Sequence, residues 1–345
     1  MKSKFSLTFI LLLVTTLFVS AARADYTKNI RKAWPKGSVT ALKVTNKFGA
    51  IKINDTGGDS VTIRVVITVG NPSSDRAREL MNMIKVDFQK SGGQAIAETR
   101  IDENFKSKQS FTIDYYINIP KDRNLDITNR YGSVVVNDLE ARGVFNISYG
   151  NLTAGRIMAP SGSPAIINVN YGKADIESVN DATMIFKYSK LYGGEISQLN
   201  LDSKYSEVNI HKVKSLNLDS KYDGINIDEI GNLKSLSKYT NYKIELLLGN
   251  FDLDTGYGSV RINKVDAKFD RIKIVNSYGG INIGLNDLDY ELKAECSYCD
   301  VDYPSDRYKG NRIRENQNFS LNGNVGNGGG SVSINSRYGG VKLTN

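Results

Sequence analysis

The dominant pattern of the chain is an alternation of apolar and polar residues that recurs around tyrosine. A phrase with an aromatic residue, a small turn residue, any residue and then apolar-x-apolar, where x is mostly polar, appears again and again, as in RYGSVVV and SYGGINI. Alternation with a period of two is typical of a half-buried β-strand. The pattern therefore predicts a strand on each side of a tight turn at the tyrosine.

Eleven tyrosines mark the copies of this phrase, most of them 17 to 22 residues apart. They are Tyr131, Tyr149, Tyr171, Tyr188, Tyr205, Tyr222, Tyr239, Tyr257, Tyr278, Tyr298 and Tyr338. Strands joined in this way bury their apolar sides only by stacking on neighbouring copies. We therefore predict an all-β fold, a parallel β-helix or β-solenoid of about eleven coils. Right-handed winding is the default for such connections.

The residues before position 121 depart from the repeat. NKFGAIKI at 46–53 is a degenerate first copy, and 62–69, 95–101 and 111–119 alternate as strands. The one predicted helix covers 73–85, where an apolar stripe is formed by Ala77, Leu80, Met81 and Ile84. We interpret this β-α-β insertion as a cap over the open end of the stack.

Residues 1–24 have the composition of a secretory signal peptide. Two lysines precede an apolar run over 5–19, and Ala22-Arg23-Ala24 is a small-x-small cleavage site. The apolar run is short for a membrane span, so we expect no transmembrane segment after cleavage. The prediction is an exported protein of the periplasm, the outer-membrane surface or the extracellular space.

These observations predict three regions. They are a signal peptide at 1–24, a first coil with its capping region at 25–120, and a β-solenoid repeat domain at 121–345. Within the last region, residues 304–330 are polar and rich in Asn and Gly, which predicts a long exposed loop.

The composition excludes most catalytic chemistries. One His and two Cys among 345 residues are too few for a zinc site or a His-based triad. The net charge of +8 falls to +5 once Lys2, Lys4 and Arg23 leave with the leader, and no nucleic-acid-binding motif is present. We therefore predict a protein that is not an enzyme, with no catalytic, cofactor or metal site and no nucleic-acid partner.

Cys296 and Cys299 form a C-x-x-C motif that overlies one copy of the repeat phrase. Cys296 falls in an inward column and Cys299 at the turn, rather than at the start of a helix as in a redox enzyme. The sequence leaves open whether the two form a local disulfide or remain free thiols.

The lysines that precede four of the tyrosines form a column, Lys187, Lys204, Lys221 and Lys238. We interpret it as a solvated face that keeps the sheet soluble, with a binding strip for an anionic polymer as the alternative. Each tyrosine lies an even number of residues after the apolar positions of the strand before it, so it would point to the same side of that strand. This favours an inward or corner-packed aromatic ladder over a carbohydrate platform. The residue after each tyrosine varies, so no positive φ is demanded in every turn.

The Tyr-Gly-x-hydrophobic-x-hydrophobic phrases, with Gly-Ile-Asn at 224–226 and 280–282, resemble a family of secreted bacterial putative adhesins. That family has β-strand repeats, is a domain of unknown function, is related to the head GIN domain of putative autotransporter adhesins and is common in Bacteroidetes. NKFGAIKI, the helix and NRYGSVVV extend the resemblance over nearly the whole mature chain. It implies a β-helical surface or periplasmic protein and supplies no catalytic or binding residues.

Taken together, the sequence predicts a non-enzymatic, adhesin-like binding scaffold of the cell envelope. It would present a polar face of the solenoid to an envelope protein or a glycan whose identity the sequence does not reveal. One alternative is a periplasmic or outer-membrane protein that regulates or binds another envelope protein. A second is a carbohydrate-active β-helix enzyme, which would need paired carboxylates on one face.

Overall fold

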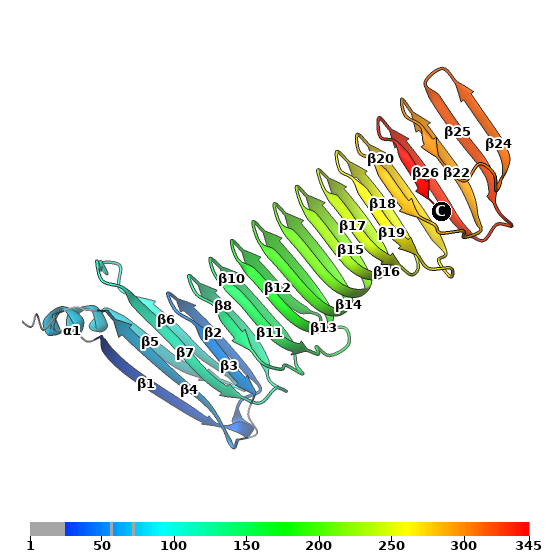
Figure 1. Ribbon diagram of the computed structural model, residues 1–345. Coiled ribbons are helices and arrows are strands. Elements are labelled where there is room, and N and C mark those ends of the chain that lie inside the picture. Colours follow the sequence, from blue (N-terminus) through cyan, green and yellow to red (C-terminus); the bar gives the residue numbers. More distant parts are fainter. Residues whose placement is uncertain (1–24, 56–57, 71–72, 345) are drawn as a thin grey trace, which may run out of the picture.

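The computed structural model describes residues 25–55, 58–70 and 73–344, and the predicted signal peptide lies outside them. Within these residues the protein is all-β, with 27 strands in one long, mostly parallel sheet and one α-helix. The sheet does not close on itself, and its strands succeed one another along an elongated molecule with the cap at one end (Figure 1).

Each copy of the repeat places one strand before its aromatic turn and one after it. The strands before the turn pair side by side in a first ladder and those after it in a second. The strands of repeat copies that belong only to the first ladder are β2 (Ala41–Lys47), β8 (Asn124–Arg130), β10 (Gly143–Ser148), β12 (Ala165–Asn170), β18 (Phe251–Gly256), β20 (Arg271–Ser277), β26 (Gly330–Arg337) and β22 (Tyr290–Ser297). Those of the second are β3 (Ile51–Asp55), β9 (Val134–Val136), β11 (Asn151–Ile157), β17 (Asn241–Leu247), β19 (Val260–Val265), β21 (Ile281–Gly284), β27 (Val341–Thr344) and β23 (Val301–Asp302).

Four long strands in the middle of the molecule belong to both ladders. They are β13 (Lys173–Lys187), β14 (Lys190–Lys204), β15 (Glu207–Lys221) and β16 (Gly224–Lys238). Each runs from one tyrosine turn to the next and pairs in parallel with its neighbour at a constant offset of 17 residues, as in Lys187↔Lys204. This offset equals the spacing of the tyrosines, so like residues lie in columns.

The predicted inward columns are confirmed. The residues three positions after the eleven tyrosines are all buried, from Val134 to Val341. The residues between the inward positions are mostly exposed or half-buried. At ~1.5–3 kcal/mol for each fully buried large side chain, these columns supply the main stabilisation of the stack.

The cap extends both ladders beyond the first copy. β6 (Gln94–Ile101) pairs with β2 and with β5 (Ile84–Ser91), whereas β7 (Phe111–Ile119) pairs with β3 and then β4 (Ser60–Val69), which pairs with β1 (Tyr26–Pro35). A short 3-10 turn, Lys36–Ser38, follows β1. The helix α1 spans Ser74–Asn82 and buries Ala77, Leu80 and Met81 as expected. It ends earlier than predicted because Ile84 begins β5, a strand that the sequence pattern did not reveal.

The predicted loop at 304–330 is wrong. Its residues form β24 (Tyr308–Glu315) and β25 (Asn318–Val325), an antiparallel hairpin in which β25 also pairs with β22. Phe319, Leu321 and Val325 of β25 are buried. The hairpin thus pairs with the edge of the last copy in the first ladder.

The last two copies are stacked out of sequence order. β26 lies between β20 and β22, so Tyr338 lies between Tyr278 and Tyr298 (Figure 1). The chain therefore forms the copy that contains β22, then the hairpin β24–β25, and finally the copy that contains β26, which pairs between β20 and β22.

Candidate functional site

A continuous row of exposed aromatic rings lies at the turns, and we call it the tyrosine ridge. It consists of Phe48 and the eleven repeat tyrosines. All twelve residues have positive φ, from 52° at Tyr188 to 63° at Phe48. This left-handed conformation costs a residue with a side chain about 1–2 kcal/mol. The chain adopts it at every turn, and the ring is thereby directed out of the molecule.

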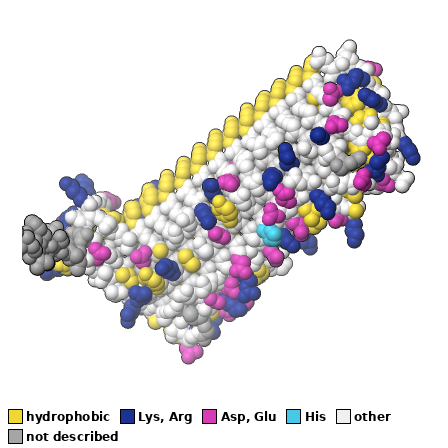
Figure 2. Space-filling model, viewed as in Figure 1, with side chains coloured by type: hydrophobic (Ala, Val, Ile, Leu, Met, Phe, Trp, Pro, Cys, Tyr) yellow, Lys and Arg dark blue, Asp and Glu magenta, His cyan; other side chains and the backbone are white. Residues whose placement is uncertain are grey.

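The rings of the ridge stack on one another along the whole molecule. Centroids of neighbouring rings are 4.7–5.1 Å apart, and the eleven tyrosines are 40–53% exposed. Figure 2 shows the ridge as a continuous apolar row along one long edge. Eleven steps of ~4.8 Å give a ridge of about 50 Å. The ladder thus lies at the corner, one of the two predicted arrangements, and the inward arrangement is wrong.

The stacking decides what the ridge can bind. In the middle of the row neighbouring ring planes are within 1–4° of parallel, so each face is covered by the next ring. A sugar that stacks on an aromatic residue needs an open ring face. The ridge instead offers solvent the edges and hydroxyl groups of its rings, which hydrogen-bond rather than stack.

The column Lys187, Lys204, Lys221 and Lys238, which we call the lysine row, borders the ridge on one side. The four lysines are in register on adjacent strands and directly precede their tyrosines. Only Lys204 has an ion-pair partner among the described residues, Asp202 at 3.4 Å. Nearer the ends of the ridge, the Arg130 and Arg337 guanidinium groups lie 4.8 and 5.1 Å from the centroids of Tyr131 and Tyr338.

The other side of the ridge is electrically balanced. Lys190 Nζ is 2.8 Å from a Glu207 carboxylate oxygen, and Lys173 Nζ is 3.2 Å from Asp175. The hydrogen bond that Lys190 donates to Glu207 lowers the pKa of Glu207 and raises the pKa of Lys190. The positive field at the ridge therefore comes mainly from the side that carries the lysine row.

A shallow hollow of about 720 Å³ lies on the outer face of the first ladder. Its lining includes the stacked carboxylates Asp202 and Asp219, and Leu236, which is 59% exposed. Asp202 and Asp219 are carboxylates in the same column of adjacent copies. Glycoside hydrolysis needs one carboxyl group kept protonated beside one that is ionised. Asp202 has an ion-pair partner, Lys204 at 3.4 Å, and Asp219 is exposed, so the two do not form the enclosed acid and base that this reaction uses.

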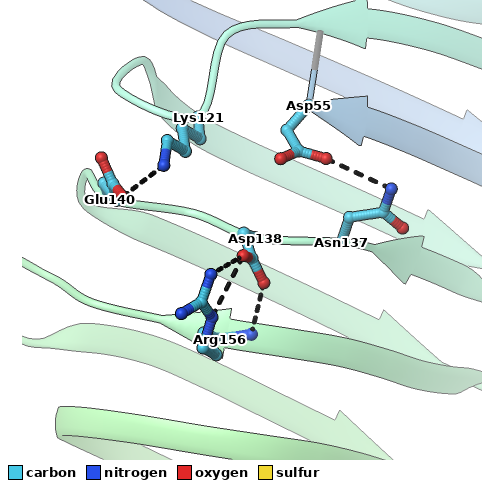
Figure 3. Close-up of polar contacts among 6 residues, drawn as sticks. All are labelled: Asp55, Lys121, Asn137, Asp138, Glu140 and Arg156. Carbon is cyan, nitrogen blue, oxygen red and sulfur yellow. Dashed lines mark hydrogen bonds and ion pairs between the residues drawn. The ribbon is translucent and has the colours of Figure 1, made fainter.

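The corner opposite the ridge carries a cluster of ion pairs near the cap (Figure 3). Arg156 donates from its backbone N–H and its Nε to the two oxygens of Asp138, each at 3.1 Å, and Lys121 Nζ is 2.6 Å from Glu140. The hydrogen bonds from Arg156 lower the pKa of Asp138, and the hydrogen bond that Lys121 donates to Glu140 raises the pKa of Lys121. Each group is held in its charged form, so the cluster joins neighbouring turns and contains no candidate general acid.

Cys296 and Cys299 are joined by a disulfide, which settles the choice that the sequence left open. Cys296 is buried in the inward column opposite Ser336, as predicted, and Cys299 occupies the turn. His211 is exposed, with its Nδ1 2.8 Å from a carboxylate oxygen of Asp228 in the next copy. Neither feature is combined with other reactive groups.

Neither a metal centre nor a membrane-spanning helix occurs among the described residues. No group of three or more His, Cys, Asp or Glu side chains in this part of the chain is arranged to hold a metal ion. No helix among the same residues is long and apolar enough to cross a membrane.

Comparisons with known proteins rest on structure alone. No protein-family model matches the chain, and a search of curated proteins finds no match. A putative adhesin from Parabacteroides distasonis is 12% identical, with 74% of this chain and 97% of that chain covered and a TM-score of 0.35. A putative adhesin from Bacteroides fragilis is 10% identical, with 92% and 97% covered and a TM-score of 0.30.

A further solved structure carries a different name. A putative lipid binding protein from Parabacteroides distasonis is 12% identical, with 93% of this chain and 97% of that chain covered and a TM-score of 0.29. The adhesin names agree with the resemblance indicated by the Tyr-Gly phrases. At these identities and TM-scores the names describe those proteins, and the site described above rests on its own geometry.

Proposed function

We propose that the protein is a non-enzymatic, adhesin-like binding scaffold of the cell envelope. Its binding surface is the tyrosine ridge together with the lysine row, and its partner is an extended acidic polymer. The observation that carries the proposal is the register of the lysine row, which places one lysine directly before a ridge tyrosine in each of four consecutive copies.

The regular spacing favours a partner that is itself regular. Each lysine contributes little alone, because an exposed charge pair in water is worth at most about 1 kcal/mol. Contacts repeated along one line act together, since the first contact raises the effective concentration for the next. An acidic glycan repeats along its length and fits such a line better than the irregular surface of a folded protein.

The absence of a catalytic role is part of the proposal. Two carboxylates support it, Asp138 in the ion-pair cluster near the cap and Glu207 beside the ridge. Hydrogen bonds lower the pKa of both, so neither is kept protonated to act as a general acid. An inert scaffold with a stack of similar surfaces needs no such group.

We further propose that the repeat region, 121–345, is a right-handed parallel β-solenoid and that residues 25–120 form its first coil and cap. The parallel pairing of neighbouring copies in both ladders, at a constant 17-residue offset in the central copies, supports this architecture. The antiparallel strands β1, β4 and β5 at one end support the boundary.

The proposed location is outside the cytoplasm, in the periplasm, on the outer-membrane surface or beyond it. The signal peptide predicted at 1–24 and the Cys296–Cys299 disulfide support export, because disulfides persist in oxidising compartments. Protease treatment of intact cells separates surface display, in which the protein is cleaved, from a periplasmic binding protein, which is protected.

The binding proposal is tested with a quadruple variant of the lysine row, K187Q/K204Q/K221Q/K238Q. The mature protein should bind dextran sulfate but not neutral dextran, and the variant should bind at least about tenfold more weakly. Raising the salt concentration should weaken binding of the unaltered protein, because exposed charges are screened.

The matched control is K214Q/K264Q/K268Q/K273Q, which removes four exposed lysines away from the ridge. It should bind dextran sulfate within about twofold of the unaltered protein. Equal losses in the two variants would mean that only net charge matters, and the ridge would lose its role. Binding to polyglutamate but not to dextran sulfate would make the partner an acidic protein.

A further inference from the structure

The outward face of the cap carries a transverse row of positive charges, far from the lysine row in sequence. Arg31 of β1 lies directly opposite Arg64 of β4, and Arg64 lies opposite Tyr116 of β7. Lys52 of β3 lies on the other side of Tyr116. The Arg64 guanidinium carbon is 4.1 Å from the centroid of the Tyr116 ring, and Lys52 Nζ is 5.5 Å from the same centroid. Three cations therefore occupy one line across four strands, which we call the cationic row.

No described acidic side chain neutralises the cationic row. Arg31, Arg64 and Lys52 take part in none of the ion pairs among the residues that the structure describes. Asp114, the next outward residue of β7, accepts hydrogen bonds from the Ala50 N–H at 2.7 Å and the Thr112 hydroxyl at 2.9 Å. Like charges directly opposite each other on antiparallel strands destabilise a sheet. An anion bound between the arginines would remove this repulsion.

Arg31, Arg64 and Tyr116 line a hollow of about 610 Å³, which lies within the usual size of small-molecule sites. Arg31 and Arg64 contribute to one part of it, and Asn54, Thr62 and Asn118 to another. The Asn54 amide donates to Asn118 at 3.4 Å and the Asn118 amide donates to Thr62 at 3.2 Å, both long hydrogen bonds. The hollow thus joins a strongly cationic part to a neutral part rich in hydrogen-bonding groups.

We propose that this hollow binds a sugar phosphate. Guanidinium groups present their N–H donors in a planar fork that matches the oxygens of a phosphate, so Arg31 and Arg64 would hold the phosphate monoester. Lys52 lies outside the lining, on the other side of Tyr116, and adds to the positive potential around the hollow. The hollow is larger than a phosphate, and the amides of Asn54 and Asn118 face the space where sugar hydroxyls would lie. The site lies on a different surface from the tyrosine ridge, so neither proposal depends on the other.

The test is calorimetric titration of the mature protein at low ionic strength with glucose 6-phosphate, inorganic phosphate and glucose. Glucose 6-phosphate should bind saturably and glucose should not bind. R31Q and R64Q should each weaken binding of glucose 6-phosphate at least about tenfold, which is the effect expected for losing a charge-assisted hydrogen bond. R261Q, which removes an exposed outward arginine of β19, should change binding less than about twofold.

Folding is checked separately, because R31Q removes one of two opposed cations. Its thermal midpoint without ligand should equal or exceed that of the unaltered protein. If inorganic phosphate binds as tightly as glucose 6-phosphate, the site binds a phosphate group alone, and the proposed contacts to the sugar are overturned. Absence of saturable binding, or an equal loss in R261Q, would overturn the proposal. So would binding only to phosphatidylglycerol vesicles and not to phosphatidylcholine vesicles, which would indicate a membrane surface instead.

Discussion

The central and flanking copies of the repeat build the same aromatic turn in two different ways. In the central copies the tyrosine is followed by a residue with a side chain, Ser189, Ser206, Asp223 or Thr240. In nearly all the flanking copies it is followed by glycine. The central copies are also those with the long strands β13–β16 and the constant 17-residue offset.

In the central copies, side chains of the turn join one copy to the next. The Gly172 N–H donates to Ser189 Oγ at 3.2 Å, the Ser189 N–H donates to Ser206 Oγ at 3.2 Å, and the Ser206 N–H donates to Asp223 Oδ1 at 2.7 Å. These hydrogen bonds run along the stack inside the turns. They satisfy backbone donors that would otherwise be buried without a partner.

In the flanking copies, the backbone itself makes the close contact. A Cβ atom added to Gly150 would lie 2.0 Å from the carbonyl oxygen of Gly132, and one added to Gly132 would lie 1.9 Å from that of Gly49. Asn129, two residues before its tyrosine, donates to the Gly49 carbonyl at 2.9 Å. The flanking turns thus need glycine because of close packing, whereas the positive φ is carried by the tyrosine.

The largest expected effect comes from adding a methyl group to a flanking turn. Gly150→Ala places its Cβ 2.0 Å from the Gly132 oxygen and 2.7 Å from the Gly132 carbonyl carbon, both backbone atoms that the ladders hold in place. We expect the free energy of unfolding to fall by more than about 3 kcal/mol, measured by urea denaturation.

Ser206→Ala is the matched control in a central turn. Its Cβ is already accommodated, and the variant loses only the hydroxyl that accepts from the Ser189 N–H at 3.2 Å and donates to the Lys204 carbonyl at 2.8 Å. The loss should be about 1 kcal/mol. Equal losses for Gly150→Ala and Ser206→Ala would contradict the distinction between the two kinds of turn.

A smaller effect is expected where the two kinds of copy agree, at the tyrosine itself. Tyr205 has a φ of 53° and stacks on both neighbours at 4.8–4.9 Å. Tyr205→Ala should lower the free energy of unfolding by about 2 kcal/mol, because two stacked pairs are lost. Tyr205→Gly should lower it by about 1 kcal/mol less, since glycine adopts positive φ without strain.

The control is Tyr192, an exposed tyrosine off the ridge whose φ is not positive. There the order should reverse, and Tyr192→Gly should be less stable than Tyr192→Ala in the same urea denaturation. If glycine is also the worse replacement at Tyr205, the conformational strain assigned to the ridge is absent.

What the sequence could and could not predict follows from the range of each signal. Alternation is local, so the inward columns, such as Val208 and Ile225, were predicted correctly. The sequence did not decide between an inward and a corner position for the tyrosines, because counting alternate residues assumes an unbroken strand and the positive φ at the tyrosine breaks it.

Other features depend on pairing partners that are distant in sequence. The hairpin β24–β25 was hidden by its Asn and Gly content, which indicates a loop unless the uncovered edge of β22 is known. The insertion of β26 between β20 and β22 leaves no local signal, because the copies are alike. The cationic row needed the register of β1, β4, β7 and β3, which places Arg31 and Arg64 together only in space.

The smallest predicted effect distinguishes Asp223 from the hydroxyl residues of the other central turns, Ser189, Ser206 and Thr240. Burial raises the pKa of its carboxyl above the ordinary value of 3.8, although the Ser220 hydroxyl and the Ser206 N–H hydrogen-bond to it. The folded state then binds the proton more tightly than the unfolded state, so stability is lost as the pH rises from about 3.8 through the raised pKa. Asp223→Ser reproduces the turn of Ser206 without a titrating group. The free energy of unfolding of this variant, minus that of the unaltered protein, should therefore be larger at pH 7 than at pH 3.5. All other carboxylates are common to both proteins and cancel in this difference. A difference that stays constant between these two pH values would show that Asp223 is as well solvated as an exposed carboxylate, and that all four central turns are equivalent after all.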